Sequence, residues 1–212
     1  MAKGLLFASF DFSTAHADEF HDWYDREHVP ERLRVPGIMN ATRWIGADDS
    51  SIAVATYDLE SLSVLQSPPY LAVGGANGSP WTKRVTNKAT RIMRFTGDQI
   101  LPGDVVSPPH AQGLLVASMN IEPAAEAEFD EWYNTEHIPF LASVPGVITA
   151  RRFRSDDPTC ERKYLALYNL ETVEVSRSDA WEKAARTPWS ARINRYFSDL
   201  LVIRCTRYQR AG

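Results

Sequence analysis

The first apolar segment of the chain, residues 4–12, alternates with a period of two. Leu6, Ala8 and Phe10 fall on one side of an extended chain, and Ser9 falls on the other. This alternation predicts a β-strand with one more apolar face. Similar patterns predict further strands over residues 38–45, 52–59, 88–95, 113–121, 147–154, 163–170 and 200–208.

A helical spacing follows the first strand. Phe20, Trp23, Tyr24 and His28 lie three or four residues apart. Residues 17–34 are therefore expected to form a helix that carries these side chains on one face and its flank. Pro30 is expected to kink or end the first part of this helix, because proline lacks the N–H that the helix interior needs.

A second helical region is predicted in each half of the chain, and the two regions differ in their proline and glycine residues. Residues 171–186 are predicted to form a continuous helix. Residues 61–79 contain Pro68-Pro69 and Gly74-Gly75, which predict a broken helix or a loop. The Pro/Gly-rich part, residues 68–78, is a candidate lid, and the sequence leaves its role open.

A nineteen-residue segment occurs twice. Residues 19–37 align without a gap with residues 128–146, a shift of 109, and ten positions are identical. Average amino-acid usage gives about one identity over such a length. Because self-similarity at a fixed distance is the signature of a repeated unit, the chain is predicted to be two copies of one unit.

Each predicted unit has the element order β-α-β-β-α-β. This order is typical of the ferredoxin-like fold, a four-stranded antiparallel sheet with helices on one face. The fold class is therefore α+β, with a first unit at residues 1–97, a linker at 98–110 and a second unit at 111–212. The two open sheet faces are expected to cover each other within the one chain.

Composition and charge limit the classes of binding partner and the cellular location that can be expected. The net charge of −4 gives no reason to expect nucleic acid or an anionic membrane. No apolar run reaches the roughly 18 residues of a membrane span, and the amino-terminal segment is interrupted by Asp11, which favours a strand over a signal peptide. Cys160 and Cys205 have no metal-like spacing, so two reduced thiols in the cytoplasm are expected.

The repeated residues form a recognisable motif, F-x-x-W-Y-x-x-E-H-x-P, followed by V-P-G and A-x-R. In the first copy these are Phe20, Trp23, Tyr24, Glu27, His28, Pro30, Val35-Pro36-Gly37, Ala41 and Arg43; in the second they are Phe129, Trp132, Tyr133, Glu136, His137, Pro139, Val144-Pro145-Gly146, Ala150 and Arg152. The motif resembles that of the dimeric α+β barrel superfamily, in its EthD-like branch.

The resemblance implies that the two ferredoxin-like units form an intramolecular dimeric α+β barrel. The superfamily includes polyketide cyclases, muconolactone isomerases, cofactor-free monooxygenases and haem enzymes. In its non-haem enzymes, the resemblance implies a pocket between sheet and helices. There a histidine, often with a tyrosine, transfers a proton on a small carbonyl or phenolic compound.

The residues themselves suggest the same chemistry. His28 follows Tyr24 by one helical turn, and His137 follows Tyr133 in the same way, so each pair can meet or point into one cavity. An imidazole can take and return a proton near neutral pH, and a phenol can hold a carbonyl oxygen as it becomes an enolate. The alternative is that the Glu-His-x-Pro motif is a helix-end device, with the histidine bonded to a carbonyl group.

The other repeated polar residues have two interpretations each. Glu27 and Glu136 are expected to form structural ion pairs with Arg43 and Arg152, although they could also act as bases. Alternatively, the two arginines bind a substrate carboxylate, which suits their bidentate geometry. The tryptophans Trp23 and Trp132 are candidate substrate contacts and equally suit the core.

These observations predict a cofactor-independent acid–base enzyme of the isomerase or cyclase type. Its substrate is expected to be a small carbonyl-bearing compound, aromatic-derived or polyketide-like, as in the catabolism of aromatic compounds. A hydrolase of a small ester or lactone and a non-catalytic ligand-binding protein are the alternatives. No metal site is expected, since no metal-binding spacing of histidines occurs. The protein is expected to be a monomer with an internal pseudo-dimer, or a homodimer.

Overall fold

The computed structural model describes residues 2–210. The first half begins with a strand and ends with another, and both helical regions cover one face of its sheet. Its elements are β1 (Gly4–Asp11), α1 (Ala17–Trp23), the π-turn η1 (Tyr24–His28), α2 (Val29–Leu33), β2 (Ile38–Gly46), β3 (Ile52–Leu59), the 3₁₀ turn η2 (Leu62–Gln66), α3 (Pro68–Val73), η3 (Gly75–Asn77), α4 (Pro80–Thr86) and β4 (Thr90–Leu101).

The second half repeats this order of strands and helical regions. Its elements are β5 (Gly113–Ile121), η4 (Pro123–Ala125), α5 (Glu126–Trp132), the π-turn η5 (Tyr133–His137), α6 (Ile138–Ala142), β6 (Val147–Arg154), β7 (Tyr164–Leu170), η6 (Val173–Arg177), α7 (Asp179–Ala185), α8 (Pro188–Ile193), η7 (Asn194–Tyr196) and β8 (Phe197–Arg207).

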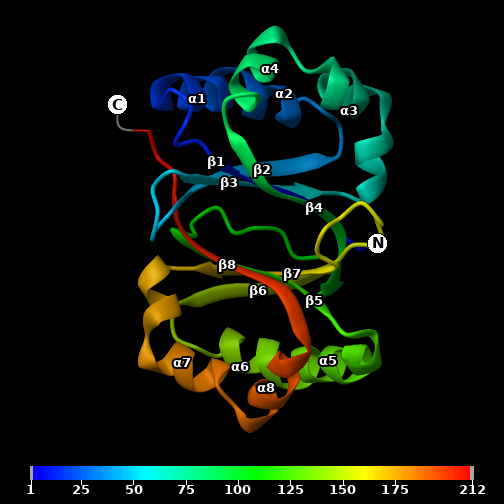
Figure 1. The fold of residues 1–212 in the computed structure, drawn as a ribbon, viewed down its shortest axis with the longest axis vertical. Coiled ribbons are helices and arrows are strands. Elements are labelled where there is room, and N and C mark those ends of the chain that lie inside the picture. Colours follow the sequence, from blue (N-terminus) through cyan, green and yellow to red (C-terminus); the bar gives the residue numbers. More distant parts are fainter. Residues whose placement is uncertain (1, 211–212) are drawn as a thin grey trace.

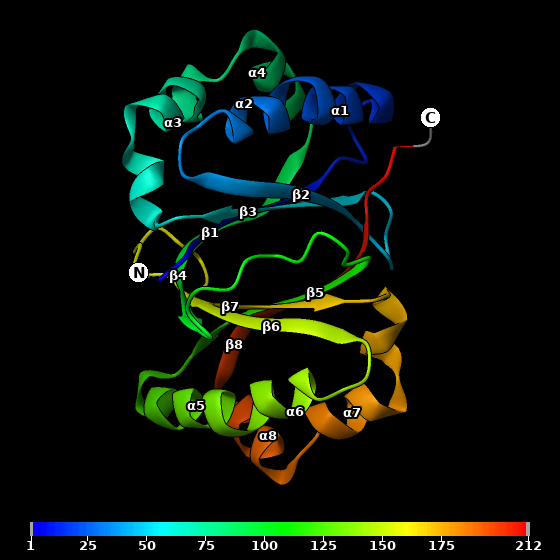
Figure 2. The same cartoon turned by 180° about the vertical axis from the view of Figure 1, so that it is seen from behind.

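All eight strands form one closed barrel in the order β1-β3-β2-β8-β5-β7-β6-β4. Within each half the neighbouring strands are antiparallel, and the halves join where β2 pairs with β8 and β4 pairs with β6. The helices of the first half lie at one end of the molecule and those of the second half at the opposite end, with the strands between them (Figures 1 and 2). The predicted α+β fold class, a barrel of two ferredoxin-like units in one chain, is confirmed.

Three apolar cores hold this arrangement together. One lies between the helices and strands of the first half and includes Phe20 and Tyr57, and its equivalent in the second half includes Phe129 and Tyr168. The third lies between the two sheets and includes Trp44. Alternate residues of each strand therefore face the helices and the opposite sheet, which is why both faces of the central strands are apolar.

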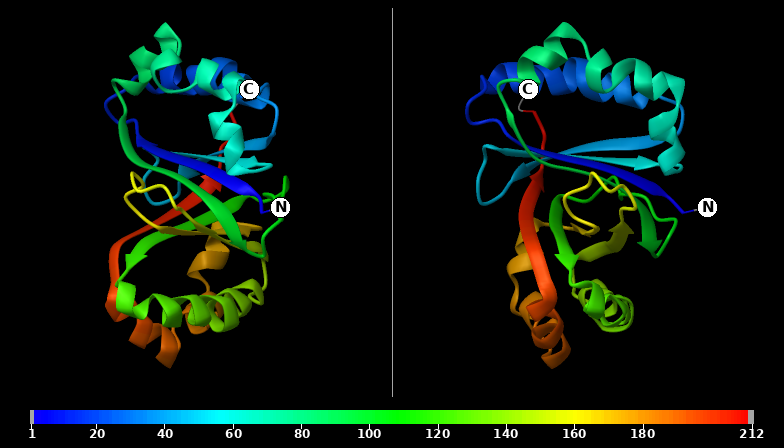
Figure 3. Two further views of the ribbon diagram at one scale, coloured as in Figure 1. Left: turned by 90° about the vertical axis from the view of Figure 1, so that its right-hand side faces the viewer. Right: turned by 45° about the vertical axis from the view of Figure 1, so that its right-hand side comes forward.

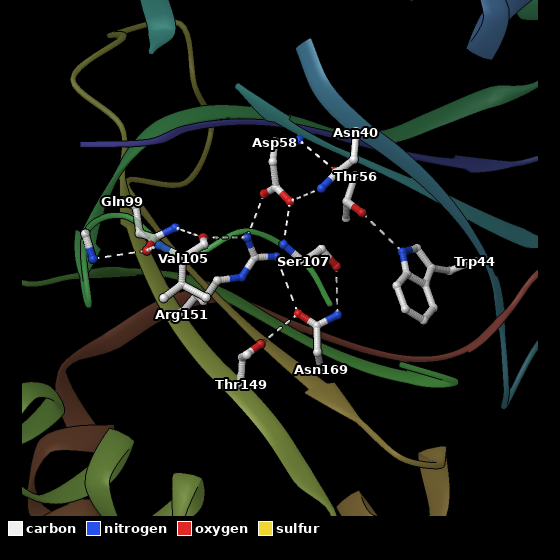
Figure 4. A network of polar contacts seen from close by, with 11 residues as sticks. Asn40, Trp44, Thr56, Asp58, Gln99, Val105, Ser107, Thr149, Arg151 and Asn169 are labelled. Atoms are coloured by element: carbon white, nitrogen blue, oxygen red, sulfur yellow. Dashed lines mark hydrogen bonds and ion pairs between the residues drawn. The ribbon is translucent and has the colours of Figure 1, made fainter. Parts of the chain in front are cut away.

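A buried polar network also joins the halves (Figure 4). Arg151 on β6 donates a 2.6 Å hydrogen bond to Asp58 on β3, and both side chains are 1% exposed. Asp58 also accepts from the backbone N–H of Ser107 at 2.6 Å. Asn169, which occupies on β7 the position that Asp58 occupies on β3, accepts from Arg151 at 3.4 Å. A buried charge pair of this kind costs about 3–5 kcal/mol when one partner is removed.

The long helical segment after β1 does not break at Pro30. It widens into a π-turn instead, in which the N–H of Val29 donates to the carbonyl oxygen of Tyr24, five residues earlier. Pro30 has no N–H to continue the normal ladder, so the wider turn passes the proline without a broken helix. The second half has the same turn, with Ile138 bonded to Tyr133.

Two predicted boundaries differ from the structure. Residues 171–186 are not one helix, because Ser178 is extended and its hydroxyl accepts from the N–H of Trp181 as the cap of α7. Strand β4 continues to Leu101, so its last residues fall within the predicted linker at 98–110 and pair with β6.

The carboxyl-terminal residues after β8 reach the helices of the first half (Figure 3). The N–H of Tyr208 donates to the carbonyl oxygen of Arg43 at 3.0 Å, and its ring stacks on His21 with centroids 4.7 Å apart. Arg210 forms an ion pair with Asp22. In the part of the chain that the structure describes, no helix combines the length and apolarity needed to cross a bilayer.

Candidate functional site

A cavity of about 930 Å³ lies in the first half, between the sheet and the helices. Strands β1 and β3 supply its floor, and α1, η1, α2, α3, η3 and α4 supply its walls. Its side chains combine apolar, aromatic and cationic groups, and they include Leu6, Trp23, His28, Arg32, Tyr57, Tyr70 and Thr82. The volume suits a ligand of several rings.

The π-turn positions His28 at this cavity. Its ring lies against Trp23, with centroids 4.5 Å apart, and against Tyr24 at 5.3 Å. The Nδ1 atom is buried and has no hydrogen-bond partner in residues 2–210. Because the ring is half-buried and lines the cavity, Nε2 is the nitrogen that can contact a ligand.

Burial controls the protonation of the polar groups here. Burial, followed by the positive charges of Arg32 and Arg43, lowers the pKa of His28 to about 3, so this imidazole is neutral at physiological pH. Burial raises the pKa of Tyr57 well above its ordinary value, so its hydroxyl stays protonated. That hydroxyl is also buried without a partner. The site therefore offers a neutral ring nitrogen and a hydroxyl to a ligand.

Arg32 is the buried cation of this cavity. It is 6% exposed, its Nη1 donates to the carbonyl oxygen of Val73 at 2.9 Å, and its guanidinium lies 5.5 Å from the centre of the Tyr70 ring. No carboxylate of residues 2–210 lies within 4.0 Å of it, whereas the buried Arg151 and Arg152 each have one. Sequence reasoning missed Arg32 because its repeat position holds Leu141, so the comparison of copies gave no signal.

The predicted pair of Tyr24 and His28 is in contact but does not share the cavity. In the described chain, the wall includes His28 and Trp23 but neither Tyr24 nor Arg43. The guanidinium of Arg43 lies 4.5 Å from the centre of the Tyr24 ring on the other side. The Tyr24 ring instead lies between His28 and Arg43, in contact with both.

Arg43 and Arg152 have protein partners of their own. Arg43 forms an ion pair with Asp25 and a 2.8 Å contact between Nη2 and His21 Nδ1. Arg152 pairs with Asp130 at 2.5 Å and lies over the Tyr133 ring. The predicted ion pairs with Glu27 and Glu136 are therefore wrong, because these aspartates lie closer to the guanidinium groups.

The two glutamates are bonded to the start of the last helix in each half. Ser79 and Thr82 donate to Glu27 Oε1 at 2.5 and 3.2 Å. Thr187 donates to Glu136 Oε1 at 2.5 Å. Each glutamate thus connects the π-turn to the start of α4 or α8 through side-chain hydroxyl groups. The contact is structural, as expected for Glu27 and Glu136, but the partners are hydroxyl groups and not the expected arginines.

The corresponding space in the second half is filled. Phe197 packs against Trp132 with ring centroids 6.1 Å apart, where the first half has Ala89. Trp181 packs against Tyr168 at 5.2 Å. Five cavities of residues 2–210 are described, and none of them is lined by His137, Tyr133, Trp132 or Arg152. Burial and Arg152 also lower the pKa of His137 to about 3.

Solved structures of the same fold cover nearly the whole chain. An anthrone oxidase-like protein superposes with a TM-score of 0.67 at 11% identity, over 99% of this chain and 92% of its own. A mutant chlorite dismutase from Candidatus Nitrospira defluvii gives 0.61 at 14% identity, over 99% and 93%. A candidate monooxygenase from Lactobacillus acidophilus gives 0.56 at 10%, over 98% and 94%. At these identities the likeness shows the fold alone, an α+β barrel of eight strands.

No protein-family profile matches the sequence, and no curated protein matches it. The EthD-like branch therefore stays a prediction from the motif.

These comparisons contradict the prediction of an isomerase or cyclase, together with its hydrolytic and non-catalytic alternatives. The similar structures are named for oxidation: a monooxygenase, a chlorite dismutase and an anthrone oxidase-like protein. The protonation of His28 gives a physical reason. Burial lowers the pKa of His28 to about 3, so its imidazole is a weak base for a proton from a phenol-like hydroxyl, whose pKa is about 10. His28 is therefore a poor proton shuttle.

The superfamily that the repeated motif resembles includes haem enzymes, so the histidines can be tested as axial ligands. A ligating histidine normally donates its other ring N–H to an acceptor. The Nδ1 atoms of His28 and His137 are both buried without a partner in residues 2–210, which leaves no such acceptor. The described residues also contain no group of three or more His, Cys, Asp or Glu side chains arranged for a metal ion. The residues present do not fit an axially held haem.

Proposed function

We propose that the chain is an oxidative enzyme that uses O₂ to oxidise a small aromatic compound, of the phenol or anthrone type, in the first-half cavity. The observation that carries this proposal is a cavity whose polar groups bind without shuttling protons. His28 is neutral and Tyr57 is protonated, and both line an aromatic space of about 930 Å³. Such a site supports a reaction that begins with electron loss from the bound compound.

The residues have simple roles in this proposal. His28 and the Tyr57 hydroxyl hydrogen-bond to the oxygen of the compound, while Trp23 and Tyr70 contact its rings. The unpartnered hydroxyl of Tyr57 makes its contact favourable, because a buried polar group without a partner is costly. The names of the similar structures agree with oxidation and supply no substrate for this chain.

The reaction balances without a further reductant. When the methylene group of an anthrone-type compound becomes a carbonyl group, two C–H bonds break and one oxygen atom of O₂ forms the new C=O bond. The other oxygen atom leaves as water with the two hydrogens. Four electrons pass from the carbon to O₂, so the compound itself is the reductant.

An oxygen electrode and isotope labelling test the proposal. Purified protein with anthrone and with hydroxynaphthalenes is expected to consume O₂ above the spontaneous rate, and the product from ¹⁸O₂ is expected to carry one labelled oxygen atom. His28→Phe should lower the rate about tenfold or more, since it removes a hydrogen bond to the reacting oxygen. His137→Phe, at the equivalent position of the filled half, should not. Equal rates in both variants, or no O₂ uptake with any compound, would refute the proposal.

We also propose that the two halves arose by duplication of one unit, as the sequence predicts. The support is the ten identities of the repeated segment and the same π-turn before Pro30 and Pro139. The filled second half is then the copy that keeps the fold without a site.

A further inference from the structure

We infer that the first-half cavity takes its substrate as an organic anion, an aromatic compound with an ionised hydroxyl or carboxyl group, and that Arg32 holds the negative charge. This inference deepens the proposed function, because it names the class of compound for the same cavity. It does not depend on oxidation, since binding of the anion can be measured alone.

The Arg32 guanidinium is a buried positive charge. Arginine remains charged in proteins and carries five N–H donors. The Arg32 side chain is almost fully buried, and one of its donors bonds to a protein atom, the Val73 carbonyl oxygen. A buried charge without an opposite charge is strongly unfavourable. A ligand anion in the cavity would remove this penalty and engage the remaining donors.

The other buried arginines differ from Arg32 because each has a carboxylate partner. Arg151 is held by Asp58 at 2.6 Å and Arg152 by Asp130 at 2.5 Å. Where a guanidinium has a structural role in this protein, the chain itself supplies the carboxylate. The fold does not need a cation on this helix either, because the equivalent position in α6 is the buried Leu141. Arg32 therefore serves the cavity and not the packing.

The groups that line the cavity around Arg32 do not neutralise its charge. His28 is neutral and Tyr57 carries a hydroxyl, so neither neutralises Arg32. At the mouth, Arg91 and Arg94 of β4 line the cavity, and no carboxylate of residues 2–210 lies within 4.0 Å of either. Glu161 also lies at the mouth, and it pairs with Arg162 at 3.3 Å. The positive side chains outnumber the negative one, which favours the entry of anions.

The cavity walls favour a planar aromatic anion. The walls include Trp23, Tyr57 and Tyr70, and aromatic rings pack well against flat ligands. A guanidinium is itself planar and matches a carboxylate or phenolate in its own plane. A planar aromatic anion satisfies both features, and an aliphatic anion would leave the aromatic walls without a matching surface. An anion also gives up an electron to O₂ more readily than its neutral form.

A pair of matched probes tests the inference by calorimetry. The anion 2-naphthoate and the neutral 2-naphthamide have nearly the same shape and differ in charge. The native protein is expected to bind naphthoate at least about tenfold more tightly, since a charge-assisted hydrogen bond contributes more than a neutral one. Arg32→Leu, which copies the second half, should remove this preference, because it weakens the binding of naphthoate much more than that of the amide. Arg32→Lys should keep part of it.

Arg34→Leu is the control, because it removes an exposed positive charge two residues away that does not line the cavity. Its preference for naphthoate should equal that of the native protein. Circular dichroism should confirm that each variant is folded. Equal affinity of the native protein for both probes, an undiminished preference in Arg32→Leu, or no binding of either probe up to its solubility limit would overturn the inference.

The outcome can be separated from that of the proposed function. A preference for naphthoate that depends on Arg32, together with no O₂ uptake for any compound, would leave the inference standing and remove the oxidative proposal. If the native protein consumes O₂ but shows no preference for naphthoate, and Arg32→Leu consumes O₂ at the same rate, the oxidative proposal stands and the inference about Arg32 is removed.

Discussion

The two helical layers share a motif and a turn, yet one encloses a cavity and the other is filled. Each layer places a histidine after a π-turn against a tryptophan, at 4.5 Å in the first half and 4.2 Å in the second. The first layer adds a buried arginine and small residues around the space, and the second adds Leu141 and Phe197. A repeated motif therefore specifies the local scaffold, while residues outside it decide whether a site exists.

The length of one connection contributes to this difference. The caps Ser67 and Ser79 are 79 − 67 = 12 residues apart, and their counterparts Ser178 and Thr187 are 187 − 178 = 9 apart. The longer connection of the first half includes Gly75, whose φ of 54° suits glycine. Here α3 and η3 form part of the cavity wall, whereas α7 inserts Trp181 into the core of the second half.

The largest expected effect comes from exchanging the arginine and the leucine between halves. Leu141→Arg should destabilise the protein by about 4 kcal/mol, because a charge enters a packed region that has no cavity and no carboxylate. Arg32→Leu should be neutral or stabilising by about 1 kcal/mol, because it removes an unpaired charge. Urea unfolding measures both. Leu141→Met should cost less than about 1.5 kcal/mol, and a similar loss for Met and Arg would mean that shape, not charge, is responsible.

A somewhat smaller effect should follow from exchanging the residues that fill or open the space. Phe197→Ala should cost about 3 kcal/mol, because it leaves a void against Trp132. Ala89→Phe should cost less, since its ring can enter an existing cavity, and it should weaken binding of aromatic ligands about tenfold or more. Thermal unfolding and ligand titration are the measurements. Unchanged ligand binding in Ala89→Phe would contradict the assignment of the cavity as the binding site.

The smallest effect concerns a property that the halves share. Burial lowers the pKa of both His28 and His137 to about 3, from 6.5. The unfolded chain takes up these protons below pH 6.5 and the native state only near pH 3, so native stability falls as the pH drops through this window. Between pH 7.5 and 5.0, each single variant, His28→Gln or His137→Gln, should lose about 2 kcal/mol less than the native protein. Parallel loss in a variant and the native protein, measured by urea unfolding at each pH, would contradict the buried neutral state.

The sequence alone determined the scaffold, since the period-two strands, the helix before Pro30 and the repeated segment all reflect local patterns. It also named His28 and Trp23, which line the cavity of the first half. It could not place Tyr24 outside the cavity, because that depends on how the helical segment packs on the sheet. It could not pair Arg43 with Asp25 instead of Glu27, because those distances exist only once a helix packs on a strand.

Tertiary structure alone decided which half has a cavity and which cation lines it. Arg32 has no repeat counterpart, and its meaning comes from the absence of a carboxylate within 4.0 Å in residues 2–210. Phe197 and Trp181 are distant in sequence from the motif whose space they fill. Periodicity reports the face on which a residue lies, whereas a void or an unpaired charge is a property of all the groups that surround it.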